Sequence, residues 1–67
     1  MNSKYSIDFE TVTPRIAERV IRDIIHESFR AKDYKTLSNA VRNYVQATGD
    51  VRKIRLYMNE YIYGLDA

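Results

Sequence analysis

The stretch PRIAERVIRDIIHESFR, residues 14–30, decides the fold of this chain. Its apolar residues recur at intervals of three and four, which is the repeat of an amphipathic α-helix. Thr13 and Pro14 form a typical helix start, because a threonine side chain caps free amides and proline is tolerated in the first turn. The apolar side consists of Ile16, Ala17, Val20, Ile21, Ile24, Ile25 and Phe29. It covers about half of the helix circumference, so we expect a central helix with two neighbours, and a second subunit is a candidate for one of them.

A second helix is predicted over residues 34–48. Asp33 is suited to cap its start, and Gly49 suits the left-handed position that ends it. Its apolar stripe consists of Tyr34, Leu37, Ala40, Val41, Tyr44, Val45 and Thr48.

A third helix is predicted over residues 51–63, with Asp50 as its cap and Gly64 as its terminator. The residues expected to face the core are Val51, Ile54, Met58, Tyr61, Ile62 and Leu65, flanked by Tyr57. The connections between the helices are short, and no repeat or linker separates them. Residues 1–67 are therefore predicted to form one small domain.

Upstream of the first helix, apolar and polar residues alternate over residues 4–11, which is typical of a half-buried β-strand. A single strand must pair with something to satisfy its backbone groups, and a second copy of the chain across a two-fold axis would provide that pairing. The alternative is an extended arm in which Tyr5, Ile7 and Phe9 cover the helices. Both interpretations stay open at this point.

The chain has 67 residues, no cysteine and one histidine, so neither a disulfide nor a thiolate metal site supplements its small core. Self-association is the remaining common route to stability. We therefore expect a mainly α fold, an N-terminal strand followed by three short helices, that assembles as a homodimer. The residues predicted at the dimer interface are Tyr5, Ile7, Phe9, Ile16, Ile25 and Phe29.

The charge of the chain is unevenly distributed, although its formal net charge is only +2. Residues 30–57 contain seven basic residues and two acidic ones. One face of the second predicted helix collects basic and amide side chains without a carboxylate, and such groups donate hydrogen bonds to phosphates and base edges. The residues predicted to contact nucleic acid are Lys35, Asn39, Arg42, Asn43, Gln46, Arg52, Lys53 and Arg55.

RNA is favoured over DNA as the partner. Tyrosines are interleaved with the basic segment, and they provide stacking surfaces for unpaired bases. The acidic residues of the predicted strand would fit poorly in a duplex groove. The alternative for the face of the second helix is a surface that is merely solvated.

A different function is indicated by the third predicted helix. Its outward side carries Leu56 and Tyr63, seven residues apart, among polar residues. Apolar side chains in such a place indicate a contact surface. The alternative function is therefore a protein-binding modulator or inhibitor of a larger machine, anchored by Leu56, Tyr57 and Tyr63.

The polar side of the first predicted helix carries a basic ridge, formed by Arg15, Arg19, Arg22, His26 and Arg30. Such a ridge is able to follow a phosphate backbone. The alternative is a solvated face whose charges pair along the helix, as Glu18 would with Arg22. His26 has no companion for catalysis, and we expect it to be exposed and without a special role.

No motif in the sequence indicates catalysis. The only glycines, Gly49 and Gly64, stand at predicted helix ends, so there is no phosphate-binding loop. No apolar stretch approaches the roughly 20 residues that span a bilayer. We expect a non-catalytic protein of the cytoplasm that uses no cofactor, metal ion, small-molecule substrate or membrane.

The order strand, helix, helix in residues 4–48 resembles the ribbon-helix-helix family of dimeric repressors. The resemblance rests on the segment Lys4-Tyr5-Ser6-Ile7-Asp8-Phe9, on Pro14, and on Leu37, Val41 and Val45. In that family, strands of two subunits pair and enter the DNA major groove. The resemblance implies that the base-reading positions are Lys4, Ser6, Asp8 and Glu10. The third predicted helix is an addition to that pattern.

In composition the chain also resembles the small early proteins with which lytic bacteriophages take over bacterial hosts. Like them it is short, free of cysteine, and rich in tyrosine and charged residues. This resemblance implies a regulator of host gene expression that binds a nucleic acid or a host protein in the host cytoplasm.

Overall fold

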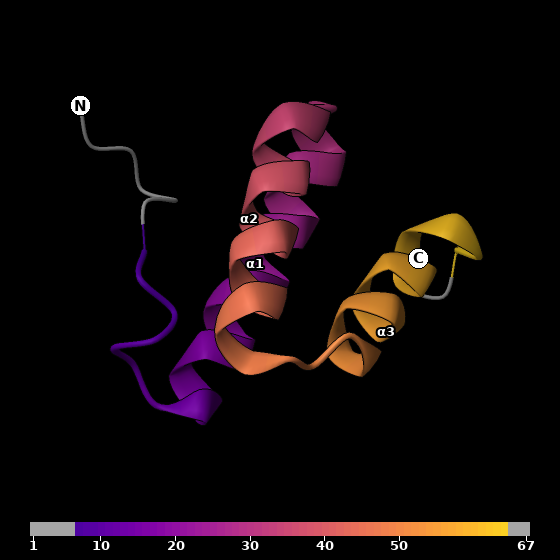
Figure 1. The fold of residues 1–67 in the computed structure, drawn as a ribbon. Coiled ribbons are helices and arrows are strands. Elements are labelled where there is room, and N and C mark those ends of the chain that lie inside the picture. Colours follow the sequence, from indigo (N-terminus) through magenta and orange to yellow (C-terminus); the bar gives the residue numbers. More distant parts are fainter. Residues whose placement is uncertain (1–6, 65–67) are drawn as a thin grey trace.

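The computed structural model describes residues 7–64, and these form three α-helices. They are α1 (Pro14–Ala31), α2 (Tyr34–Thr48) and α3 (Arg52–Ile62). α1 and α2 form an antiparallel hairpin, and α3 stands to one side of it (Figure 1). The prediction of a mainly helical fold is confirmed.

α1 begins at the predicted residue. The hydroxyl of Thr13 accepts a hydrogen bond from the backbone N–H of Ile16 at 3.3 Å, and Pro14 occupies the first turn. The helix continues to Ala31, one residue further than predicted, and Lys32 follows in the left-handed conformation with φ 58°. Lys32 is the one non-glycine residue with positive φ in the described part of the chain. This conformation reverses the chain directly into α2.

α2 has the predicted bounds, and both predicted end signals are present. Asp33 Oδ1 accepts a hydrogen bond from the backbone N–H of Thr36 at 3.1 Å, and Asp33 Oδ2 accepts one from the Thr36 hydroxyl at 2.7 Å. These bonds favour the carboxylate and lower the pKa of Asp33. At the other end, Gly49 has φ 72° and its N–H donates to the carbonyl of Val45 at 2.8 Å.

α3 begins one residue later than predicted, because Val51 occupies the cap position. Asp50 still supplies the capping oxygen, since its Oδ1 accepts from the N–H groups of Arg52 at 3.0 Å and of Lys53 at 3.5 Å. The helix ends two residues before Gly64, which has φ 69°.

The core is centred on α1. Ile21 and Ile25 are completely buried, and α2 and α3 both pack on this side of the helix. The two predicted neighbours of α1 are therefore present, and both belong to the same chain. The buried apolar residues are Phe9, Ala17, Ile21, Ile24, Ile25, Leu37, Ala40, Tyr44, Ile54 and Tyr57.

α3 contributes less to this core than its apolar pattern predicted. Ile54 and Tyr57 are buried, but Val51 is exposed and Ile62 is 62% exposed. Met58 is half-buried against the core. The difference arises because α3 packs chiefly on α1, so only one side of α3 is covered.

The segment before α1 turns back over the hairpin. The backbone N–H of Thr11 donates to the carbonyl of Asp8 at 3.1 Å, and the N–H of Glu10 donates to Asp8 Oδ1 at 3.0 Å. Residues 7–11 are the described part of the predicted strand, and here the chain forms a turn. Asp8 accepts hydrogen bonds from backbone N–H groups that, in a strand, would donate to a neighbouring strand. Residues 4–6 of that prediction lie outside the described residues.

The apolar residues of this turn cover the helices. Phe9 is buried and its ring meets that of Tyr44 edge to face, with 5.4 Å between the centroids. Ile7 packs on the core and is half-buried. Ile7 and Phe9 thus lie as the arm interpretation expects, whereas Tyr5 is outside the described residues.

Candidate nucleic-acid interface

The outer face of α2 consists of Lys35, Asn39, Arg42, Asn43 and Gln46. All of these residues are exposed. α2 buries a single stripe, which contains Leu37, Ala40 and Tyr44, so the opposite side of the helix is turned outward. The structure therefore brings together the residues that the sequence singled out on this helix.

Two carboxylates approach one end of the outer face, although α2 itself contains none. The turn before α1 places Asp8 and Glu10 around a pocket of about 310 Å³ that Asn43 and Gln46 also line. Lys35 lies roughly 16 Å from this end, at 1.5 Å per residue along the helix. The face is therefore basic towards the start of α2 and acidic towards its end.

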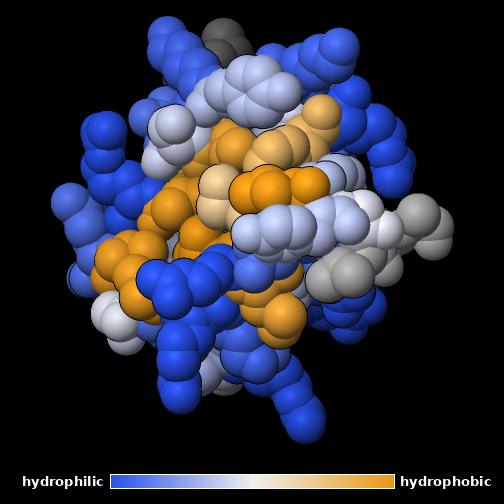
Figure 2. Space-filling view, turned by 90° about the vertical axis from the view of Figure 1, so that its right-hand side faces the viewer, coloured by the Kyte–Doolittle hydropathy of each residue, from blue (hydrophilic) through white to orange (hydrophobic). Residues whose placement is uncertain are grey.

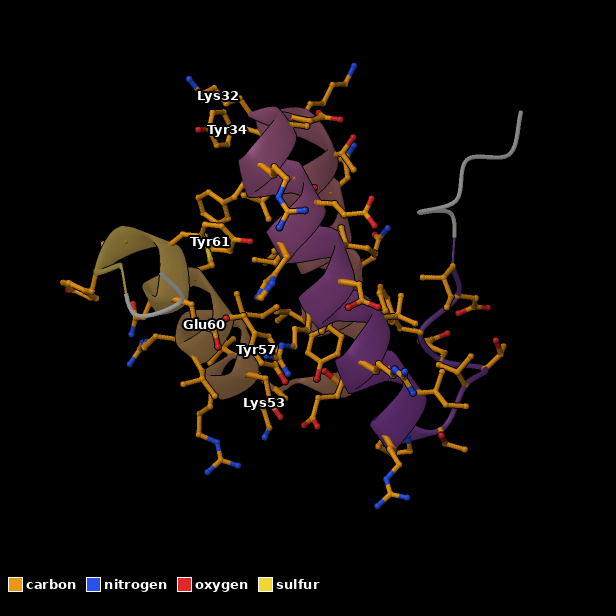
Figure 3. All side chains as sticks on the ribbon, turned by 180° about the vertical axis from the view of Figure 1, so that it is seen from behind. Lys32, Tyr34, Lys53, Tyr57, Glu60 and Tyr61 are labelled. Carbon is orange, nitrogen blue, oxygen red and sulfur yellow. The ribbon has the colours of Figure 1, made fainter. Side chains whose placement is uncertain are left out.

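The basic end is extended by the connection between α1 and α2. Lys32 and Lys35 are exposed there, and the side chain of Tyr34 is 53% exposed. Figure 3 shows Lys32 and Tyr34 next to one another at this end of the molecule. The Tyr34 ring meets Phe29 edge to face at 6.1 Å between centroids, which supports one edge of the ring. An exposed ring that lysines flank in the sequence is suited to stack on an unpaired base.

The three basic residues predicted on α3 have different surroundings. Arg52 and Arg55 are exposed. The Nζ atom of Lys53 lies 3.1 Å from the carboxylate of Glu18 on α1. The hydrogen bond to Glu18 and the negative charge of that residue raise the pKa of Lys53. Lys53 therefore forms part of the contact between α1 and α3.

Of the three residues predicted to bind a protein partner, two lie at the surface. Leu56 is exposed, and Tyr63 is 71% exposed. Tyr57 is only 7% exposed, and burial raises the pKa of its hydroxyl. Tyr57 therefore does not lie at the surface with Leu56 and Tyr63, because α3 turns this residue towards α1, where the guanidinium of Arg22 lies 5.6 Å from the ring centroid.

The residues predicted at a dimer interface are divided between core and surface. Phe9 and Ile25 are buried within the single chain, so they belong to its own core. Ile7 and Phe29 are half-buried against that core. Ile16 is exposed at the start of α1.

His26 is not the exposed residue that the sequence led us to expect. Its Nε2 atom lies 2.8 Å from Glu60 Oε1 on α3, and both side chains are half-buried. The Tyr61 ring meets His26 edge to face at 5.1 Å, and its hydroxyl donates to the His26 carbonyl at 3.2 Å. Figure 3 shows Glu60 and Tyr61 extending from α3 towards α1. No local pattern reveals this contact, because 34 residues separate its partners.

Three side-chain contacts that involve charged or polar groups align α3 with α1. In order along both helices they join Glu18 with Lys53, Arg22 with Tyr57, and His26 with Glu60. Residue numbers rise together on the two helices, so α3 runs parallel to α1. All four arginines of the basic ridge predicted on α1 are exposed, but Arg22 and His26 also contact α3, which leaves Arg15, Arg19 and Arg30 clear of that contact.

Within residues 7–64, no three His, Asp or Glu side chains are grouped so as to hold a metal ion. Over the same residues, no helix has the length and apolar character needed to cross a bilayer. No protein-family model, curated protein or solved structure matches the chain. The function is therefore argued from the surface itself.

Proposed function

We propose that the protein is a non-catalytic nucleic-acid-binding protein that uses the outer face of α2, and that it serves as a regulator. The observation that supports this most is the exposure of the whole face on a helix without a carboxylate. Lys35 and Arg42 would neutralise phosphates, while Asn39 and its neighbouring amides would donate to phosphates or base edges.

Single-stranded RNA is favoured over duplex DNA by the two ends of the face. Tyr34 lies between Lys32 and Lys35 in the sequence and offers an exposed ring on which an unpaired base stacks. Asp8 and Glu10 lie at the other end and repel a phosphate backbone that continues along the helix. A rigid duplex meets that repulsion, whereas a single strand bends away from it.

Fluorescence anisotropy with labelled single-stranded RNA and duplex DNA, over a series of salt concentrations, tests this proposal. Arg42→Glu reverses a central charge and should weaken RNA binding by about ten-fold or more. Tyr34→Ala should weaken RNA binding more than DNA binding. The matched control is Arg19→Glu, which makes the same change of net charge at an exposed position of α1.

Equal losses for Arg42→Glu and Arg19→Glu would show that RNA responds to net charge and not to the outer face of α2. Undetectable binding of RNA and DNA by the wild-type protein at low salt would overturn the proposal.

A second candidate function, modulation of a larger host protein machine, is favoured by the exposure of Leu56 on α3 and of Tyr63, the residue that follows α3. These residues are seven apart in the sequence and are exposed apolar side chains among polar neighbours. In this case Tyr63→Ala should abolish the association with a co-purifying protein and leave RNA affinity unchanged. Loss of RNA affinity in Tyr63→Ala with the association intact would contradict it.

A further inference from the structure

An apolar area lies open between α2 and α3. α3 packs chiefly on α1, and Lys53, Tyr57 and Glu60 mark the edge of α3 that makes this contact. At 100° per residue, Met58 and Ile62 lie on the opposite edge of α3. Met58 is half-buried and Ile62 is exposed, so this edge is only partly covered by the rest of the chain.

α2 presents a matching apolar edge. Asn43 and Gln46 mark the side of α2 that faces the N-terminal turn. Val41 and Val45 lie on the other side, packed on the core but half-buried. We define the α2–α3 face as Tyr34, Val41, Val45, Val51, Met58 and Ile62. Figure 2, which views the molecule from the side where α3 stands in Figure 1, shows apolar side chains gathered in one area with hydrophilic side chains around it.

The charges beside the middle of the α2–α3 face are positive. Arg55 lies on the same edge of α3 as Met58, and Arg42 is one turn from Val45 on α2. α2 contains no Asp or Glu, and the one acidic residue of α3, Glu60, lies against His26 on the opposite edge. The carboxylates of Asp33 and Asp50 lie at the starts of α2 and α3, beside Tyr34 and Val51 at the two ends of the face, where they accept hydrogen bonds from helix-start amides.

We propose that the α2–α3 face binds an amphipathic helix of a protein partner whose polar side is acidic. A helix satisfies its own backbone hydrogen bonds, so it can bind through side chains alone along the apolar strip between two helices. Its apolar residues would contact Val45, Met58 and Ile62, and its Glu or Asp residues would meet Arg42 and Arg55. α3 has 11 residues, so a helix of about the same length, roughly 16 Å, fills the strip.

Arg42 and Arg55 also argue against a second copy of this chain as the occupant of the α2–α3 face. A two-fold pairing of the α2–α3 face would bring Arg42 and Arg55 against the same residues of the other copy. Like charges in that position oppose association, whereas an acidic helix relieves them. The α2–α3 face adjoins the outer face of α2, and Tyr34 and Arg42 are used by both. The inference does not depend on the proposed nucleic-acid function, because it rests on the apolar side chains of Val45, Met58 and Ile62.

The test uses a designed peptide of about twelve residues, with leucines at helical spacing and glutamates elsewhere, titrated into the full chain and followed by calorimetry and NMR. One control peptide has the same composition in scrambled order, and another has lysine in place of glutamate. Ile62→Asp changes an exposed residue of the face, and Arg55→Glu changes an exposed residue beside it. Leu56→Asp is the matched control, because Leu56 is a similarly exposed apolar residue on the outer side of α3.

We expect the acidic amphipathic peptide to bind one-to-one, with shift changes at Val45 and Met58, and to bind ten-fold or more tighter than either control peptide. Ile62→Asp and Arg55→Glu should each weaken it about ten-fold, and Leu56→Asp should leave it within about two-fold. Equal binding of the scrambled peptide, or equal losses for Ile62→Asp and Leu56→Asp, would overturn the inference.

Two further results assign the face to another occupant and would also overturn it. One is a ten-fold loss of RNA affinity in Ile62→Asp without any binding of the peptide. The other is a dimer in sedimentation that Ile62→Asp dissociates and that the peptide does not displace.

Discussion

The imidazole of His26 and the carboxylate of Glu60 meet across the contact between α1 and α3, with 2.8 Å between Nε2 and Oε1. Tyr61, the next residue on α3, packs its ring on the same imidazole and bonds to the backbone carbonyl of His26. Neighbouring residues of α3 thus hold one side chain of α1. The pair stabilises the position of the second half of α3.

Glu60→Ala should lower the free energy of unfolding by about 1 kcal/mol, because it removes a half-buried hydrogen-bond partner of His26. His26→Ala should have a similar effect. Urea denaturation of both variants and of the double variant measures the coupling, and the double variant should lose less than the sum of the single losses. Strict additivity would show that the two side chains do not interact in solution.

Ser28→Ala should raise the free energy of unfolding by about 1 kcal/mol. Ser28 is 2% exposed, and its Oγ atom has no hydrogen-bond partner in the described part of the chain. Removing a buried, unsatisfied hydroxyl relieves its desolvation. The matched control is Ser38→Ala on the exposed side of α2, for which the change should stay within about 0.5 kcal/mol. A loss of stability in Ser28→Ala would point to a bonded hydroxyl.

The helix cap at Asp33 makes the free energy of unfolding depend on pH in the acidic range. The Thr36 hydroxyl and amide lower the pKa of Asp33 below its ordinary 3.8, so the folded state binds this proton less readily than the unfolded state. The stability that Asp33 contributes is fully present above the pKa that this residue has in the unfolded chain. It is lost as the pH falls through the lower pKa that Asp33 has in the folded protein. Asp33→Asn keeps an oxygen that caps the helix but does not titrate. Unfolding measured as a function of pH should therefore depend less steeply on acid in Asp33→Asn, and identical slopes would contradict this account.

The homodimer expected from the sequence is tested by sedimentation equilibrium at micromolar concentration, which should give about twice the chain mass of 7.9 kDa. Ile16 is the exposed apolar residue in the core-facing pattern of α1, so Ile16→Asp should shift the protein to a monomer while it stays folded. Leu56→Asp, the matched exposed change on α3, should leave the mass unchanged. A cooperatively folded wild-type monomer at that concentration would contradict the dimer.

Helix ends were the most predictable part of this fold. Asp33 and Gly49 enclose α2 with the bounds expected, because a capping carboxylate and a left-handed glycine act within a few residues of the chain. Lys32 shows the limit of such signals. It takes a left-handed conformation without being glycine, and so nothing in the sequence distinguished it as the end of α1.

Contacts between helices were much less predictable. The apolar period predicts one side of α3 to be buried, but it does not show that α3 packs chiefly on α1, so Ile62 is predicted in the core and is exposed. The exposure of the carboxylate-free face of α2 follows from the helical repeat. Asp8 and Glu10 nevertheless reach its far end through a turn that local periodicity does not describe.

The placement of α3 has a consequence for how the native state opens. Most of the buried side chains belong to the α1–α2 hairpin and the turn before it, whereas α3 adds Ile54 and Tyr57 together with half-buried polar pairs. Segments with few buried apolar contacts open at lower free energy than the whole molecule. The amide hydrogens of α3 should therefore exchange with solvent through a partial opening that leaves the hairpin intact, so that the hairpin and α3 act as separate cooperative units.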